Sequence, residues 1–417
     1  MTTDRVLAAD QPVGGRHGLD SPRAKAIVAA LAITQTVGYG TLYYAFAVFL
    51  IPLATDLNAS TTAITGSFTA SVLASAALAV PVGRWLDKHG GRALMTTGSA
   101  AGTALLLAWS QIDSLWQLYA VQIGIGLASA ACLYEAAFAV IIAWHTPKRR
   151  SSALLALTVV AGFASTIFMS LTGWLVDRYD WRTTLLVLAI IHALLTIPLH
   201  ATVLRSAPRP PATESAPKDE RPPVRMRAVL SDRGFWLLTL SFTAHTGAIA
   251  TVGVHLVAAL ITWGHTAAFA ATVAGLFGVL SVTGRLVTTS LQRRFRTTTV
   301  VAAIFALQAL AAAALPVVGR DAIPAIAAVA GFGLGFGVGS IAKPLLLAKR
   351  YETRRYATIA GTLVIPMTIA KATSPLAAAA LHTSSHSYTS VFVVAGALCV
   401  IASAALLTLN NARFSGE

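Results

Sequence analysis

Four charged side chains stand inside long apolar stretches of this 417-residue sequence, namely Glu135, Arg285, Lys343 and Lys371. A charge at the centre of a lipid bilayer costs about 2.5–3.5 kcal/mol even on lenient insertion scales, so each of them needs a role or a partner. Cations held in a water-filled cavity bind anions, and a carboxyl group there can take up and release a proton. The sequence therefore indicates anion binding and proton transfer, provided that its apolar stretches cross a membrane.

Lys371 lies near the middle of its apolar stretch, too far from either end for its ammonium group to reach the membrane surface. Thr368 and Ser374 lie within one helical turn of it, and such a small, polar face suits a cavity better than lipid. We expect Lys371 to bind substrate. The alternative is a buried ion pair with Glu135.

Arg285 shares its helical face with the small residues Gly278 and Ser281. A guanidinium group stays charged in any environment and binds a carboxylate through two hydrogen bonds. We expect Arg285 to bind substrate as well, the alternative being extension toward the cytoplasmic surface. Lys343 lies within two turns of the cytoplasmic end of its stretch, so we expect its side chain to reach the water there.

Glu135 has two possible roles, which are proton coupling and a fixed ion pair with a cation. Tyr39, Tyr43 and Phe46 share one face of the first apolar stretch. We expect Tyr39 and Tyr43 to line a substrate pocket, whereas the alternative for such an aromatic stripe is ordinary helix packing.

Other patterns that suggest chemistry have simpler explanations. His382 and His386 have metal-ligand spacing, but no third ligand accompanies them. The alternating glycines of 331–339 resemble a phosphate loop, but they lie in an apolar stretch with no strand before it, so close helix packing explains them. We expect no metal, no cofactor and no enzymatic activity.

The composition requires lipid as the solvent for most of the chain. Hydrophobic residues make up 56% of the sequence and charged residues 11%, with a mean hydropathy of +0.70. The net charge of +15 comes from short loops between apolar stretches, so no nucleic-acid partner is expected. Cys132 and Cys399 lie inside apolar stretches and imply no disulfide framework. Residues 1–24 lack the apolar core of a cleavable signal peptide.

A membrane-spanning helix needs about 20 mostly apolar residues, and the sequence offers twelve such stretches. They cover roughly residues 27–53, 61–84, 93–111, 116–144, 151–176, 183–204, 235–263, 267–291, 298–318, 322–348, 356–381 and 387–409.

The basic residues predict the orientation of these helices. If the N-terminus is cytoplasmic, 25 of the 31 Lys and Arg fall on the cytoplasmic side and three on the other side, which is typical of membrane proteins. We therefore expect a multi-pass protein of the plasma membrane, or of the inner membrane in a bacterium, with both termini cytoplasmic. The expected parts are a tail (1–24), a first bundle (25–204), a proline-rich linker (205–230), a second bundle (231–409) and a tail (410–417).

A short charged loop, residues 83–92, joins the second and third stretches. Gly83 allows a close helix approach, and Gly90 and Gly91 permit the backbone bend that ends one helix and starts the next. Asp87 can accept hydrogen bonds from the N-terminal amides of a helix or from the neighbouring cations Lys88 and Arg92.

This loop resembles the signature between helices 2 and 3 of the major facilitator superfamily, through Gly83, Asp87, Lys88, Gly90 and Arg92. The resemblance implies an all-α membrane protein with twelve transmembrane helices in two six-helix bundles, the major facilitator fold. It also implies a secondary transporter that works by alternating access, in which these five loop residues form a conformational latch between the bundles.

The pairing of Arg285 with Lys371 resembles the oxalate:formate antiporters and their monocarboxylate-transporter relatives, whose equivalent residues bind substrate carboxylates. Many monocarboxylate members have an Asp where this chain has Ser281, so lactate-type coupling is not implied. We therefore expect a monomer in the lipid bilayer that moves a small organic anion, a mono- or dicarboxylate. Either protons or a counter-anion would drive it.

Two other functions remain as alternatives. Proton-driven exporters of drugs or other xenobiotics are the first, although Ala120 stands where such exporters have an Arg and residues 161–166 lack their Gly-Pro motif. The second is a membrane receptor, but the sequence contains no soluble signalling domain.

Overall fold

The computed structural model describes residues 22–205, 226–351 and 355–409, and every element in them is a helix. The expected tails and most of the expected linker lie outside the described residues. In chain order the helices are α1 (Pro22–Tyr39), η1 (Gly40–Tyr44), α2 (Ala45–Asp56), α3 (Thr61–His89), α4 (Gly91–Trp109), α5 (Leu115–Cys132), α6 (Tyr134–Trp144), α7 (Pro147–Ala161), α8 (Ala164–Arg178), α9 (Trp181–Thr202), α10 (Met226–Ser231), α11 (Arg233–Thr262), α12 (Ala267–Leu291), α13 (Thr297–Val318), α14 (Ala322–Leu334), α15 (Val338–Arg350), α16 (Tyr356–Ser385) and α17 (Tyr388–Leu409).

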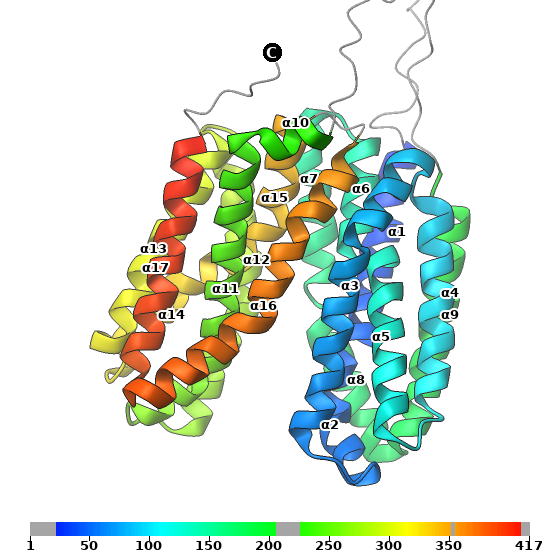
Figure 1. Ribbon diagram of the computed structural model, residues 1–417, viewed down its shortest axis with the longest axis horizontal. Helices are drawn as coiled ribbons and strands as arrows, with labels where there is room; N and C mark the ends of the chain where they lie inside the picture. The colour runs from blue at the N-terminus through cyan, green and yellow to red at the C-terminus, as the bar shows by residue number, and fades with distance from the viewer. Residues whose placement is uncertain (1–21, 206–225, 352–354, 410–417) are drawn as a thin grey trace, which may run out of the picture.

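Eleven helical segments in the described chain are long and apolar enough to cross a membrane. The twelfth span is α4, which runs beside α5 and α9 (Figure 1). Large apolar side chains such as Leu194, Leu310 and Val317 are 69–80% exposed, as expected where lipid covers the surface. The prediction of an all-α membrane protein with twelve spanning helices is confirmed.

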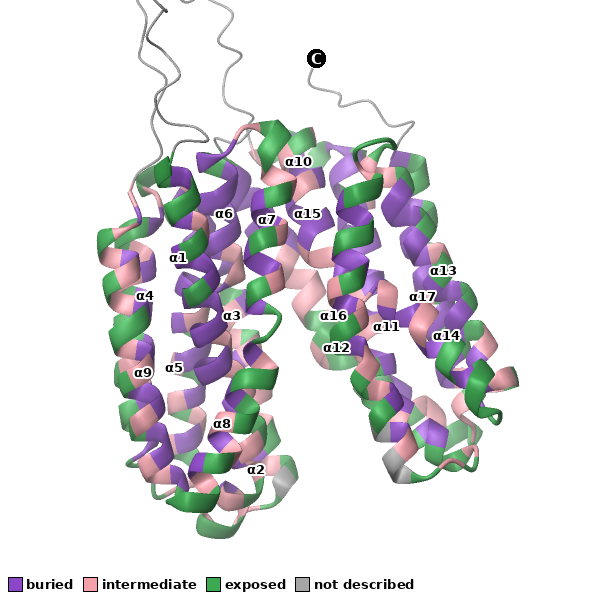
Figure 2. Ribbon diagram, turned by 180° about the vertical axis from the view of Figure 1, so that it is seen from behind, coloured by how far each residue is buried: buried purple, intermediate pink, exposed green. Residues whose placement is uncertain are grey.

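The helices form two bundles, α1 to α9 and α11 to α17, which meet near α10 and lie apart at the opposite end (Figure 1). We call these the joined end and the opposite end. Contacts between the bundles link α3 to α16, α7 to α12 and α15, and α6 to α15 and α16. Figure 2 shows buried residues along α6, α7 and α15 near the joined end, where the two bundles contribute to one hydrophobic core.

Side-chain oxygens cap several of the helices where the chain turns. Ser60 and Thr266 accept a hydrogen bond from the amide three residues further on, which satisfies one of the free N–H groups of a helix start. Asp232 caps α11 by accepting from the Gly234 amide at 3.0 Å. Gly90 adopts a φ of +77° between α3 and α4, so the predicted glycine bend lies at this residue.

Four spans are interrupted instead of continuous, a feature that was not predicted from the sequence. The first contains the π-helix η1, and the fourth breaks at Leu133, whose backbone is extended. The fifth breaks at 162–163 and the tenth at 335–337. Irregular backbone within a membrane occurs where it is covered by protein or lines a cavity, and Tyr43 of η1 and Leu133 line the cavity described below.

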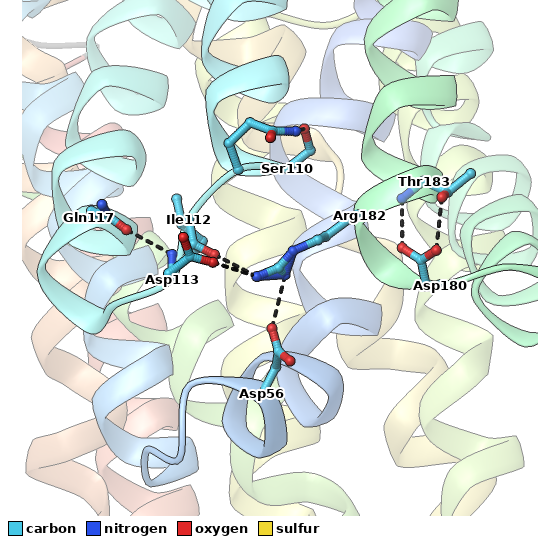
Figure 3. Close-up of polar contacts among 9 residues, drawn as sticks. Asp56, Ser110, Ile112, Asp113, Gln117, Asp180, Arg182 and Thr183 are labelled. Carbon is cyan, nitrogen blue, oxygen red and sulfur yellow. Dashed lines mark hydrogen bonds and ion pairs between the residues drawn. The ribbon is translucent and has the colours of Figure 1, made fainter.

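A charged network connects helix ends of the first bundle at the opposite end (Figure 3). Arg182 lies 2.9 Å from a carboxylate oxygen of Asp56 and 2.9 Å from one of Asp113. Asp180 accepts from the amide and the hydroxyl of Thr183, and these hydrogen bonds lower the pKa of Asp180. The network joins the ends of α2 and α9 to the loop before α5.

A second clamp lies at the joined end within the other bundle. Asp232 accepts two hydrogen bonds from Arg350, at 2.8 and 2.9 Å, and one from the Tyr351 hydroxyl. Burial opposes the charge of Asp232, but hydrogen bonds from Arg350, Tyr351 and the Gly234 amide outweigh burial and lower its pKa. The stabilisation is therefore complete at neutral pH and is lost as the pH falls through that lowered value.

Candidate functional site

A cavity of about 230 Å³ lies between the bundles. The first bundle contributes Tyr39, Tyr43, Phe68, Tyr134 and Glu135, besides small residues such as Ser71, Ser75 and Ser129. The second contributes Thr246, Lys343, Val364, Met367, Thr368 and Lys371. The cavity therefore has aromatic and hydroxyl walls, and its charged groups are two lysines and one glutamate.

Lys371 projects from α16 into this cavity. Its ammonium group donates to the Tyr43 hydroxyl at 2.9 Å and lies 4.8 Å from the centre of the Tyr43 ring. Among the described residues it makes no recorded ion pair, so the predicted alternative of a pair with Glu135 is wrong. A cation–π contact of this kind stabilises a charge by about 0.5–2 kcal/mol and leaves it uncancelled.

Glu135 pairs with Lys343 instead. The Lys343 ammonium lies 2.5 Å from Oε1 of Glu135, and the two side chains are 5% and 32% exposed. The expectation that Lys343 reaches the cytoplasmic water is therefore wrong, because its side chain lies between the bundles. The sequence does indicate that Glu135 pairs with a lysine. Glu135 is the only carboxylate within the predicted spans, and a lysine at membrane depth needs a partner because an unpaired charge there is costly.

Arg285 is buried near the cavity but is not part of its lining. Its guanidinium group donates to the Thr158 carbonyl at 3.0 Å and to the Gly337 carbonyl at 3.3 Å. Thr158 lies at the end of α7 and Gly337 directly before α15, so both acceptors are beside helix breaks. Arg285 thus joins the two bundles through neutral acceptors and keeps its positive charge.

The aromatic residues of the first span divide into two groups. Tyr39 and Tyr43 line the cavity, beside and within the π-helix η1, and Tyr39 also contacts Tyr134. Phe46 is 6% exposed and packs against Phe68 and Trp109 inside the first bundle. The extra residue per turn of η1 explains why Phe46 does not share a face with Tyr39 and Tyr43, contrary to the prediction.

The loop of residues 83–92 connects the bundles through two of its members. Asp87 Oδ1 accepts from the Ala357 amide at 2.9 Å, and Oδ2 accepts from the Thr358 amide and hydroxyl at 2.8 and 2.5 Å. A side chain at Gly83 would collide with the Ala357 backbone. Asp87 therefore binds the free amides at the start of α16, where the helix dipole favours a negative charge.

The other members of this loop act within the first bundle or face solvent. Arg92 donates to the Ala201 carbonyl at 2.8 Å, Gly90 forms the bend, and Lys88 is exposed. Ala357 and Thr358 could not be predicted from the sequence as the partners of Asp87, because any residue can supply a backbone amide. No group of three or more possible metal ligands occurs within the described ranges.

Comparison with known proteins gives consistent results. Residues 31–365 match the family model described as Major Facilitator Superfamily. A curated relative, an MFS-type efflux pump of Mycolicibacterium smegmatis, is 27% identical over 209 residues. That match covers 49% of this chain and 48% of the relative, so the chain spans about half the length of the relative.

Solved structures share the fold across almost the whole chain. The E. coli fucose:proton symporter FucP has a TM-score of 0.72 at 14% identity, covering 92% of this chain and 98% of that one. The human organic anion transporter MFSD10 has a TM-score of 0.70 at 15% identity, covering 93% and 100%. A bacterial homologue of the iron transporter ferroportin, in an outward-facing state, has a TM-score of 0.73 at 13% identity, covering 93% and 99%. At these identities the likeness shows the fold alone.

Proposed function

Because this chain belongs to the major facilitator superfamily and is a multi-pass membrane transporter, we propose that it moves a small organic anion by alternating access. The observation that carries the proposal is the charge of the cavity, which two lysines and one glutamate line. Glu135 is already paired with Lys343, so Lys371 remains with a neutral hydroxyl partner. A mono- or dicarboxylate supplies the charge that this cavity lacks.

Each charged residue has a part in this proposal. Lys371 binds the carboxylate in the state described here, with Tyr39 and Tyr43 as its walls. Arg285 adds positive potential nearby, and its hydrogen bond to Thr158 breaks if the bundles move apart at the joined end, which frees the guanidinium for the anion. Glu135 carries the coupling proton.

Asp87 acts as a conformational latch in this scheme. Its three hydrogen bonds to α16 hold the joined end closed, and Gly83 allows the close approach that they require. The basic loops indicate that the joined end is cytoplasmic, so the described state faces outward. Membrane-impermeant labelling of Lys148→Cys and Ser385→Cys from opposite sides tests this orientation, and labelling of both from one side would contradict it.

The anion proposal is tested by the thermal stability of purified protein in the presence of carboxylates. Stabilisation by a carboxylate is expected for the parent and lost in Lys371→Ala. Arg285→Ala should weaken the stabilisation, and Lys371→Arg should retain part of it with altered preference among carboxylates, because a planar fork replaces a point charge. Lys148→Ala removes an exposed lysine that is not part of the cavity lining and serves as the matched control. Equal stabilisation of Lys371→Ala and the parent would contradict the proposal.

Drug efflux is the second candidate, since the curated relative is named an efflux pump and aromatic side chains line the cavity. The two functions differ in the expected sign of one effect. Lys371→Ala should weaken the binding of an anion but strengthen the binding of a lipophilic cation such as tetraphenylphosphonium, because it removes a positive charge from the cavity.

A further inference from the structure

The ion pair between Glu135 and Lys343 suggests how the substrate and the proton are coupled. We propose that Glu135 occupies Lys343 in place of the transported carboxylate, so that an incoming carboxylate binds Lys343 while Glu135 takes up a proton. Lys343 is then a second anion-binding residue beside Lys371. This inference rests on the proposed anionic substrate and on the proposed proton-coupling role of Glu135, and it adds Lys343 as the residue that exchanges Glu135 for the substrate.

The geometry of the pair fits temporary occupation better than a permanent structural link. Only Oε1 of Glu135 contacts Lys343, and Oε2 is buried with no hydrogen-bond partner. Within the described residues the Lys343 ammonium, which has three N–H groups, makes one recorded hydrogen bond. A buried ion pair stabilises a fold best when the remaining donors and acceptors are satisfied, and Oε2 of Glu135 has no partner among the described residues.

The position of the pair makes exchange possible. Both side chains line the cavity that contains Lys371, so a bound anion reaches Lys343 without a change in the fold. The Glu135 side chain is 32% exposed, so water can reach its carboxylate and supply a proton. The two residues come from α6 and α15, which belong to different bundles, so the exchange occurs where the bundles meet.

The surroundings of Glu135 contain few other groups that could replace its proton or its charge. Tyr39 of the first span and Tyr356 of α16 interact with it electrostatically, and Tyr134 precedes it. Besides Lys343, only Lys371 among the charged residues on the described helices packed against α6 lines the cavity with Glu135. The others are Arg23 and Lys25 on α1, Arg84, Asp87 and Lys88 on α3, Arg92 on α4, Lys148, Arg149 and Arg150 on α7, and Lys349 and Arg350 on α15.

Charge and protons balance in this exchange. Before binding, Lys343, Lys371 and ionised Glu135 give the cavity a net charge of one positive unit. A monocarboxylate brings one negative charge and Glu135 gains one proton from water, so the net charge is unchanged. No covalent bond forms or breaks, and the Glu135–Lys343 contact is replaced by a contact between the substrate and Lys343. A monocarboxylate and a proton therefore move together without net charge.

The test is the pH dependence of lactate and oxalate binding to purified full-length protein. The parent should bind more tightly at acidic than at neutral pH, by at least about tenfold, because binding requires protonation of Glu135. Glu135→Gln imitates the protonated state, so its affinity should equal the acidic value of the parent at every pH. The double variant Glu135→Gln/Lys343→Met keeps an uncharged pair of similar size and should bind weakly throughout.

Two results would overturn the inference. One is a Glu135→Gln variant that keeps the pH dependence of the parent. The other is a double variant that binds as tightly as Glu135→Gln alone. In either case, if Lys371→Ala still loses binding, the anion proposal stands and only the exchange fails. If the parent binds neither lactate nor oxalate at any pH, both proposals fail together. Lys148→Ala, outside the cavity, should match the parent throughout.

Discussion

Asp87 and Glu135 are both carboxylates of the first bundle that bind the second bundle, but their partners differ in kind. Asp87 accepts from two backbone amides and the Thr358 hydroxyl at the start of α16. Glu135 accepts from the lysine side chain of α15, inside the cavity. The amides are fixed by the helix backbone, whereas an ammonium group on four methylene carbons can turn to another anion.

The two contacts therefore respond to different changes in the protein. A contact with helix-start amides reports only whether α3 and α16 are close together. A contact with a cavity lysine also depends on what else occupies the cavity and on the pH. We propose that the Asp87 contact controls which end is closed and that the Glu135–Lys343 pair couples this change to the substrate.

The largest expected effect comes from removing one member of the pair. Lys343→Ala should lower the free energy of unfolding by about 2–3 kcal/mol, because it leaves a carboxylate without its cation in a partly buried position. Glu135→Ala/Lys343→Ala should recover much of that loss. Chemical denaturation of the two single variants and the double variant gives the coupling energy, and strictly additive effects would contradict a functional pair.

Gly83→Val is expected to act on the closed joined end. The new side chain would collide with the Ala357 backbone, and overpacking of this kind costs about 1–3 kcal/mol. That cost lowers the population of the closed state roughly 5- to 150-fold. Thr246 lines the cavity, so a cysteine at this position should then react faster with a thiol reagent added on the cytoplasmic side. The native Cys132 and Cys399 are buried and should contribute little to this reaction.

The matched control for this variant is Gly275→Val, whose added side chain begins in open space. It should leave the reactivity of the cysteine at position 246 unchanged. Equal reactivity in the two glycine variants would show that the approach of α3 to α16 has no part in closure.

A smaller effect is expected for Asp87→Asn. An amide side chain keeps one acceptor oxygen but loses the charge, which weakens the hydrogen bonds by about 1–2 kcal/mol. Transport by reconstituted protein should fall roughly 5- to 30-fold while membrane insertion remains normal. Transport at the parental rate would contradict the latch.

The smallest effects are expected at the opposite end, where carboxylates join helices of a single bundle. Asp56→Asn and Asp113→Asn each remove one exposed partner of Arg182 (Figure 3). Each should lower the free energy of unfolding by about 0.2–1 kcal/mol, and less at high salt. Transport should be unchanged. A loss of transport equal to that of Asp87→Asn would show that position between the bundles is not what distinguishes Asp87.

Much of the fold was predictable from the sequence. Long apolar stretches determine where helices cross the bilayer, because an unpaired backbone amide in lipid costs several kcal/mol and only a helix satisfies all of them locally. The loop of residues 83–92 identified the family, and its glycine bend lies at Gly90 as expected. The cost of intramembrane charge also selected Glu135 and Lys371, which both line the cavity.

Only the tertiary structure decided which charges meet. The sequence offered Glu135 two lysines in separate spans, and the approach of α6 to α15 selected Lys343. Likewise the breaks at Leu133 and η1 change which side chains face the cavity. These breaks could not be predicted from the sequence, because the predicted helical faces assume the periodicity of an ideal helix. Hydropathy is a local property that each segment carries alone, whereas an ion pair across bundles depends on the relative positions of residues 208 apart in the chain.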